Sequence, residues 1–198
     1  MTVLTTQRLV LREWTEDPAD LARLFDIYSR PEVARWLGAP GLPLTDPAQA
    51  VDRLAIWRER HAGHGGRYGI WAIEVRDTGV VVGSVLLQPL PGRDEGTLTE
   101  DIEVGWHLHP DSWGHGYATE AGGAAAAREL AAGTREVYAV VAPGNEASMA
   151  VARRHDPCGP PLGLVRRRVP GDLRAARSLL TRPTTRPAPA VRSAWRSW

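Results

Sequence analysis

The 198-residue sequence has no lysine, a single cysteine and no long apolar run. The single cysteine, Cys158, excludes an internal disulfide and a cysteine-rich metal site. No window approaches the roughly 18 apolar residues that a membrane-spanning helix needs, so we expect no membrane partner. The first residues, MTVLTTQRLVLREW, lack the basic start, apolar segment and cleavage site of a secretory signal. We therefore expect a cytoplasmic protein.

The charge balance lacks an excess of either sign. All 24 basic residues are arginine, which we attribute to a coding bias toward G and C, and with 23 acidic residues they give a net charge of +1. Residues 1–154 hold 15 Arg and 21 acidic residues (−6), whereas 155–198 hold 9 Arg and 2 Asp (+7). Within that basic segment only Trp195 and Trp198 are aromatic. We therefore expect no nucleic-acid partner. The alternative is that the basic segment is an arm that binds nucleic acid.

Apolar periodicity predicts a mixed α+β domain over residues 1–154. The first half is read as a strand at 7–14, helices that begin after Asp17 and Asp46, a short helix through 33–37, and a hairpin of strands 68–75 and 80–87. A strand at 100–109, a helix at 117–132 and a strand at 135–141 then fit a parallel crossover, and a helix begins at 147. Seven prolines interrupt residues 155–198, which we expect to be a disordered tail.

The most informative stretch is DIEVGWHLHPDSWGHGYATE, residues 101–120, where a strand leads through a glycine turn into a helix. Glycines leave the backbone N–H groups at a helix N-terminus open, and those donors favour an anion. The spacing matches neither a dinucleotide-binding fingerprint nor a P-loop. Taken alone, the turn is as well explained by a plain strand-to-helix connection.

Four segments, in order, extend this observation: TTQRLVLREWTEDPADLARLFDIYSRPEVARWLG, IWAIEVRDTGVVVGSVLL, EVGWHLHPDSWGHGYATEA and APGNEASMAVARR. From residue 5 to about 154 the chain resembles the GNAT superfamily of N-acetyltransferases, in the branch that includes the ribosomal-protein N-terminal acetyltransferases. The pyrophosphate loop of that family reads [QR]-x-x-G-x-[GA]; here Gly116 and Ala118 match, and Trp113 replaces Gln or Arg, as is usual in the branch.

The resemblance implies the acyl-CoA N-acyltransferase fold, a mostly antiparallel sheet flanked by helices, and acetyl-CoA as co-substrate. It implies that backbone amides bind the pyrophosphate, that one strand pairs with the pantetheine arm and that a side chain after the next strand holds that arm. The residues it assigns to acetyl-CoA are Trp106, His107, Leu108, Trp113, Gly114, His115, Gly116, Tyr117, Ala118, Thr119 and Asn145.

The implied mechanism is direct attack of an amine on the thioester, without an acyl-enzyme. Glu103 matches the E-[IV]-G-[YW] strand and is our candidate for the base, or for the anchor of a proton-carrying water. The alternative is that Glu103 binds the substrate ammonium or pairs with an arginine. Asn145 and Ser148 match an N-x-x-S element, in which Ser148 would protonate the departing thiolate. The alternative for this pair is helix capping.

Two alternatives to an acetyltransferase site are a metal site and a catalytically impaired acyl-CoA-binding protein. His107, His109 and His115 lack a further ligand at usable spacing, so we expect no metal. An acyl-CoA-binding protein with impaired catalysis would keep Gly114–Ala118 without depending on Glu103 or Ser148. The sequence does not identify the acceptor amine, which the loops 38–45 and 91–99 would help to select. It does not determine the oligomeric state either.

The resemblance stops after Arg154, where relatives continue with L-G-M or L-G-F and two further strands. We expect those strands to be missing. A change of reading frame near Arg153 would explain this: if Arg154–Gly159 is coded CGG CAT GAC CCC TGC GGG, the frame shifted by one reads GMTPAG. Codons can likewise be chosen for Leu162–Val169 so that the shifted frame reads SGWYDAEF. The gene sequence across residues 150–198 tests this hypothesis.

Overall fold

The computed structural model describes residues 1–37, 41–91, 97–154 and 162–166. Within them, one sheet runs in the order β1-β2-β3-β4-β5-β6-β7. Neighbours are antiparallel from β1 to β5, whereas β5, β6 and β7 are parallel. The strands are β1 (Thr2–Thr5), β2 (Leu9–Glu13), β3 (Gly69–Val75), β4 (Val81–Pro91), β5 (Leu98–Leu108), β6 (Val137–Val141) and β7 (Leu162–Arg166).

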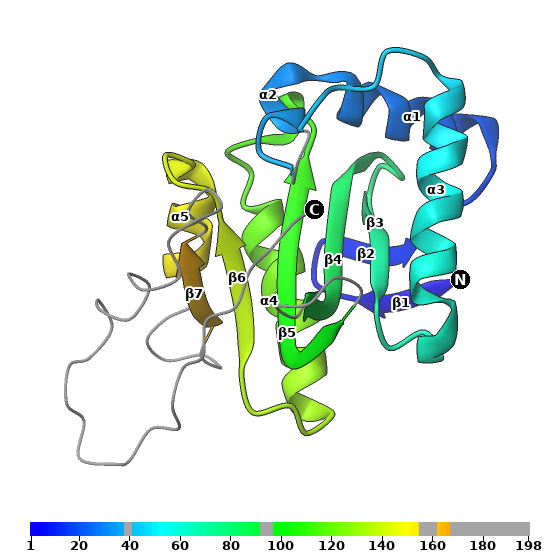
Figure 1. Cartoon of the computed structure of the whole chain (residues 1–198). Helices are drawn as coiled ribbons and strands as arrows, with labels where there is room; N and C mark the ends of the chain where they lie inside the picture. Colours follow the sequence, from blue (N-terminus) through cyan, green and yellow to red (C-terminus); the bar gives the residue numbers. More distant parts are fainter. Residues whose placement is uncertain (38–40, 92–96, 155–161, 167–198) are drawn as a thin grey trace, which may run out of the picture.

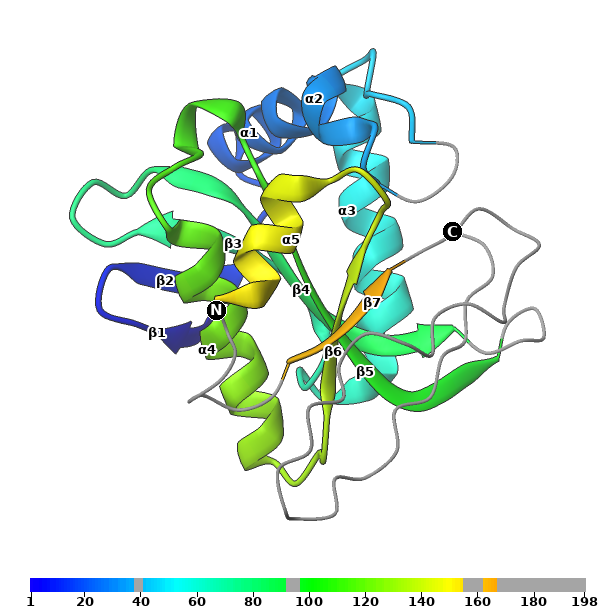
Figure 2. The same ribbon diagram turned by 90° about the vertical axis from the view of Figure 1, so that its left-hand side faces the viewer.

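Helices cover both faces of the sheet (Figures 1 and 2). They are α1 (Pro18–Ser29), α2 (Pro31–Ala34), α3 (Ala48–His61), α4 (Tyr117–Ala131) and α5 (Glu146–Arg153), with short 3-10 turns η1 (Ala62–His64) and η2 (Pro110–Ser112). One buried cluster, around Val104, packs the sheet against α4, and a second, around Tyr28 and Trp57, packs it against α1 and α3. The predicted fold class is confirmed. No helix of the described ranges is long and apolar enough to cross a bilayer.

Local signals account for most of these elements. Asp17 accepts a hydrogen bond from the N–H of Ala19 at the start of α1, and Asp46 does the same for Ala48 at the start of α3. Gly79, in the turn between β3 and β4, has a φ of 68°. Helix α4 joins β5 to the parallel strand β6, so the predicted crossover is confirmed. Strand β1 was not predicted, because four residues are too few to show an alternation.

Strand β7 corrects the expectation that no regular element follows residue 155. The segment Leu162–Arg166 pairs in parallel with Val137–Val141 at the edge of the sheet. We did not predict this strand because the segment is rich in proline. The stretch between Pro161 and Pro170 nevertheless has room for the five residues of β7, which form hydrogen bonds with the otherwise unpaired edge of β6. The segment that we expected to lack regular structure therefore contributes a seventh strand to the sheet. The rest of the predicted tail, with Cys158, lies outside the described residues.

A nearly buried carboxylate joins α4 to the segment before β3. Glu129 is 1% exposed and accepts hydrogen bonds from Arg67 Nη2 at 2.6 Å, Thr134 Oγ1 at 2.5 Å and the Tyr68 hydroxyl at 3.4 Å. Burial raises the pKa of Glu129, but the hydrogen bonds from Arg67 and Thr134 outweigh burial, and the pKa lies below its usual value. The ionised form is therefore the one that the fold stabilises.

We expect the Arg67→Met variant to lower the free energy of unfolding by about 2 kcal/mol at pH 7, because it leaves a buried charge without its cation. A carboxylate with a lowered folded pKa stabilises the fold above its unfolded pKa of about 4.3, and that contribution is lost as the pH falls. The difference from wild type should therefore shrink below about pH 4. Urea denaturation at pH 7 and below about pH 4 measures this difference in the free energy of unfolding. Arg76→Met is the control, because Arg76 is exposed and among the described residues donates only to backbone carbonyls.

Candidate functional site

Strands β5 and β6 separate partway along their length. Their parallel pairing runs from Ile102–Val137 to Val104–Ala139 and ends there. A cavity of about 480 Å³ lies where they diverge, lined by residues 105–107 of β5 and by residues 140–143 at the end of β6. The edge of β5 that faces β6 therefore offers backbone groups to a ligand beyond Val104. An extended chain with amide groups, such as pantetheine, fits an edge of that kind.

The structure brings three predicted side chains to this one cavity. Glu103 comes from β5, and Asn145 and Ser148 come from the start of α5. Trp106 and His107, which the resemblance assigns to the pantetheine arm, also line the cavity. Leu108 and the segment 113–119 are not among its lining residues; they form the end of β5, the glycine turn and the first turn of α4.

The register of β4 against β5 sets the surroundings of Glu103. Gln88 stands opposite Glu103, and its Nε2 donates a hydrogen bond to Glu103 Oε2 at 3.2 Å. Ile102 and Val104 are buried against α4, so strand alternation turns Glu103 to the opposite face. Gln88 is 8% exposed, and its Oε1 accepts no hydrogen bond within the described part of the chain. The cavity wall thus holds a carboxylate next to a buried carbonyl oxygen.

Asn145 caps α5, which is the alternative raised for it above. Its Oδ1 accepts a hydrogen bond from the backbone N–H of Ser148 at 3.1 Å. Ser148 is half-buried, and its hydroxyl lies in the first turn of the helix, where the backbone N–H groups favour negative charge. Because both residues also line the cavity, capping holds Ser148 at its edge.

The glycine turn before α4 has the backbone that an anion site needs. Gly114 and Gly116 both have a φ of 79°, the left-handed region that favours glycine. Among the described residues no side chain caps the helix at Gly116, so in this part of the chain the first N–H groups of α4 stay open to a ligand. The Thr119 hydroxyl is buried without a partner among the described residues. Arg8 Nη1 donates to the carbonyl of His115 at 3.0 Å, and Arg8 Nε pairs with Glu120 of α4 at 2.6 Å, so this arginine holds the turn against the helix. These features fit a pyrophosphate.

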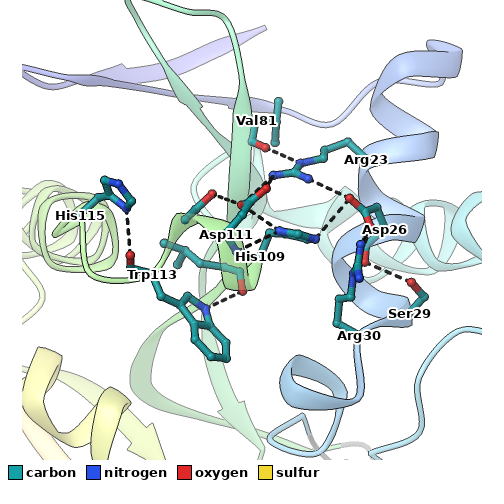
Figure 3. A network of polar contacts seen from close by, with 11 residues as sticks. Arg23, Asp26, Ser29, Arg30, Val81, His109, Asp111, Trp113 and His115 are labelled. Carbon is teal, nitrogen blue, oxygen red and sulfur yellow. Dashed lines mark hydrogen bonds and ion pairs between the residues drawn. The ribbon is translucent and has the colours of Figure 1, made fainter.

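A polar network positions the turn (Figure 3). His109 lies 3.3 Å from Asp26 of α1 and 2.8 Å from Asp111 of η2, and Arg23 contacts both carboxylates. The Trp113 indole N–H donates to the carbonyl of Leu108 at 3.0 Å, which fastens the turn to the end of β5. His109 therefore links α1 to the turn. Among the described residues no group of three or more His, Cys, Asp or Glu could hold a metal ion.

His107 places its imidazole in the wall of the cavity, 3.1 Å from the Tyr28 hydroxyl. The resemblance pointed to the backbone of this residue, so the side chain adds a polar group that was not anticipated. Burial, and next the charge of Arg53, lower the pKa of His107 to about 4. The ring is consequently neutral at pH 7.

Helix residues that sequence reasoning missed complete the cavity. Arg53, Trp57 and Arg60 of α3 line it, together with Arg35 just after α2. The spacing i, i+4, i+7 on α3 was the available signal, since such residues share one helix face. That spacing alone does not show whether the face meets a cavity or the core. Parts of the loops expected to select the acceptor, 38–40 and 92–96, lie outside the described residues.

Comparison with known proteins gives concordant results. A family model described as the acetyltransferase (GNAT) domain matches residues 8–156. An uncharacterised N-acetyltransferase, p20, of Bacillus licheniformis is 30% identical over 124 residues, which are 61% of this chain and 62% of the relative. The match thus spans less than two thirds of that relative's length.

Two solved structures share the fold. An acetyltransferase from Agrobacterium tumefaciens is 28% identical, with a TM-score of 0.57 over 80% of this chain and 86% of that one. An acetyltransferase from Salmonella typhimurium, which modifies the N-terminal serine of the ribosomal protein L7/L12, is 15% identical, with a TM-score of 0.57 over 78% of this chain and 83% of that one. At 15% identity the second likeness concerns the fold alone.

Proposed function

This chain belongs to the GNAT acetyltransferase family, and on that premise we propose that it transfers the acetyl group of acetyl-CoA to a primary amine. The acceptor would be the α-amino group of a protein N-terminus or a small amine. The observation that carries the proposal is the cavity at the divergence of β5 and β6, where Glu103 and Ser148 meet around one space. The open N-terminus of α4 supports it as the site for the pyrophosphate.

The proposed reaction needs one new bond and two proton movements. The amine nitrogen bonds to the carbonyl carbon of the acetyl thioester, and the C–S bond breaks. The amine proton passes to Glu103 or to a water that Glu103 holds, and the thiolate takes a proton from the Ser148 hydroxyl. Water in the cavity returns a proton to the Ser148 oxygen, and the proton gained by Glu103 passes to water, which restores both side chains. No residue of the chain is acetylated in this scheme, so the reaction does not require Cys158.

The amount of base strength needed depends on the amine. At pH 7 deprotonation costs roughly 4 to 5 kcal/mol for a lysine side chain with a pKa of about 10.4, but only about 1 kcal/mol for an α-amino group with a pKa near 8. The candidate base Glu103 is a carboxylate, and carboxylates are weak bases compared with amines. This favours an α-amino group, or another amine of low pKa, as the acceptor.

Release of free thiol from acetyl-CoA tests the proposal in wild type, Glu103→Ala and Ser148→Ala. An enzyme releases thiol only when an amine is present and slows in both variants. An acyl-CoA-binding protein with impaired catalysis would bind acetyl-CoA, measured by calorimetry, and release no thiol with any amine in all three forms. That second result would refute the enzymatic proposal.

We expect Ser148→Ala to lower kcat by roughly 10-fold, near the lower end of acid–base effects. The loss is modest because a thiol with a pKa of about 8.5 leaves readily as its thiolate. Steady-state kinetics should give an unchanged KM for acetyl-CoA, and thermal melts an unchanged Tm, because the backbone N–H of Ser148 that Asn145 caps is retained. Ser29→Ala, on α1 outside the cavity lining, is the matched control; equal losses in both variants would remove Ser148 from the mechanism.

A further inference from the structure

A cation on α3 lines the cavity, and no carboxylate of the described residues pairs with it. Arg53 is half-buried, and its guanidinium lies over the Tyr28 ring, 4.9 Å from the ring centre. Within the described ranges no carboxylate pairs with it. Six other arginines do have acidic partners there: Arg8, Arg12, Arg23, Arg30, Arg58 and Arg67. Within these ranges the charge of Arg53 thus contacts an aromatic ring and no acidic group.

The position of Arg53 leaves its charge poorly compensated. Burial lowers the pKa of Arg53, which reflects the loss of water around the guanidinium, yet an arginine stays charged at every physiological pH. The neighbouring His107 is neutral and cannot offset that charge. A half-buried cation at the wall of an open cavity is stabilised by an anion that enters the cavity.

The two walls of the cavity differ in charge. The helix wall carries Arg53, with Arg35 stacked on Trp36 nearby. The strand wall carries the Glu103 carboxylate and the Gln88 Oε1, a buried acceptor without a donor among the described residues. An N–H group of a ligand would satisfy Gln88 Oε1, and a negatively charged group of the same ligand would satisfy Arg53. The two unmet requirements therefore point to a ligand with a nitrogen at one end and an anion at the other.

We propose that the acceptor is a primary amine that carries an anionic group, a carboxylate or a phosphate, whose nitrogen lies at Glu103 and Gln88 and whose anion lies at Arg53. This inference rests on the proposed function, since it specifies the substrate of the same site. It also disfavours polycationic amines, because the arginines of the helix wall repel a second positive charge.

The test compares pairs of amines in which one member carries an anion and the other a neutral group in its place. Because a neighbouring anion also raises the pKa of the amine, kcat/KM is expressed per concentration of neutral amine. Alanine is paired with alaninamide, phosphoethanolamine with ethanolamine, and a peptide whose second residue is aspartate with the same peptide carrying asparagine. The three pairs distinguish a small carboxylate, a phosphate and an acidic protein N-terminus as the source of the charge. We expect kcat/KM, measured by thiol release, to favour the anionic member of at least one pair by roughly 10- to 100-fold, the worth of a hydrogen bond to a charged group.

Variants at Arg53 then connect that preference to the residue. Arg53→Gln should reduce the anionic-to-neutral ratio of kcat/KM toward one, mainly through a higher KM for the anionic amine, whereas Arg53→Lys should retain most of it. Arg58→Gln is the control, because Arg58 lies on the same helix but pairs with Glu16 outside the cavity. The inference is overturned if neutral members react as well as anionic ones, or if Arg53→Gln lowers both equally.

A binding measurement separates this inference from the proposed function. Calorimetry measures the binding of the N-acetylated form of the preferred anionic amine, or of N-acetylalanine if no amine reacts. It therefore tests the anion site without turnover. Binding by wild type that weakens about 10-fold in Arg53→Gln supports the anion site even if no thiol is ever released. Thiol release with neutral amines only, together with absent product binding, would leave the transferase proposal standing and reject the anionic acceptor.

Discussion

Replacement of Glu103 by glutamine is expected to lower kcat by roughly 100- to 10,000-fold at neutral pH, the range that general bases contribute. Glutamine keeps the size of the side chain and can still meet Gln88, so the wall of the cavity is retained while the proton acceptor is lost. The KM for acetyl-CoA should change little. Stopped-time measurement of thiol release with a saturating amine determines kcat, and Glu59→Gln, an exposed carboxylate on α3, is the control.

The pH dependence and the KM of the amine separate the two roles considered for Glu103. If the carboxylate accepts the proton, the deficit of Glu103→Gln should narrow above about pH 8, where an α-amino group is already neutral. If the carboxylate only holds the substrate ammonium, the KM for the amine rises and kcat is retained. Equal kinetics in wild type and Glu103→Gln would contradict both roles.

Substitution of Gly114 by valine is expected to weaken acetyl-CoA binding by roughly 10- to 100-fold, corresponding to a backbone strain of about 1–3 kcal/mol. A β-branched residue does not adopt a φ of 79° readily, so the turn must shift and the N–H groups before α4 lose their common direction. No atom lies within 4 Å of a Cβ added at Gly114, so the effect comes from the backbone and not from a clash. Calorimetric titration with acetyl-CoA measures the Kd.

Gly133→Val gives the matched control for that experiment. Gly133 follows the other end of α4, has a φ of 101° and likewise has open space around an added Cβ. It should lose a similar amount of stability and bind acetyl-CoA as wild type does. If both variants lose affinity equally, the weakening reflects general destabilisation, and the turn before α4 has no special part in binding.

Features that depend on local sequence were predictable. Asp17 and Asp46, which accept N–H hydrogen bonds at the starts of α1 and α3, and the alternation of β5 depend on residues that are close in sequence. The alternation of β5 determines the face on which Glu103 lies. The crossover from β5 through α4 to β6 was predictable because two parallel neighbouring strands need a long connection, which is usually a helix. Local patterns assign residues to helices and strands but give them no chemical role. The resemblance to the family suggested those roles.

Features that depend on long-range contacts were not predictable. Gln88 becomes part of the cavity only because the register of β4 sets it opposite Glu103, 15 positions away in the sequence. Arg53 reads as an ordinary exposed helix residue until its helix is packed over Tyr28. Strand β7 exists because β6 offers it a free edge, which no local pattern shows. Each case depends on partners that the sequence does not place side by side.

The most direct test of the account follows the acetyl group itself. The protein is mixed with acetyl-CoA and an amine, and mass spectrometry then counts acetylated amine and acetylated protein while free thiol is counted in parallel. The account predicts one acetylated amine for each thiol released and no acetyl group on the protein at any time. Thiol release that leaves an acetyl group on the protein, or no release at all by folded protein that binds acetyl-CoA, would contradict it.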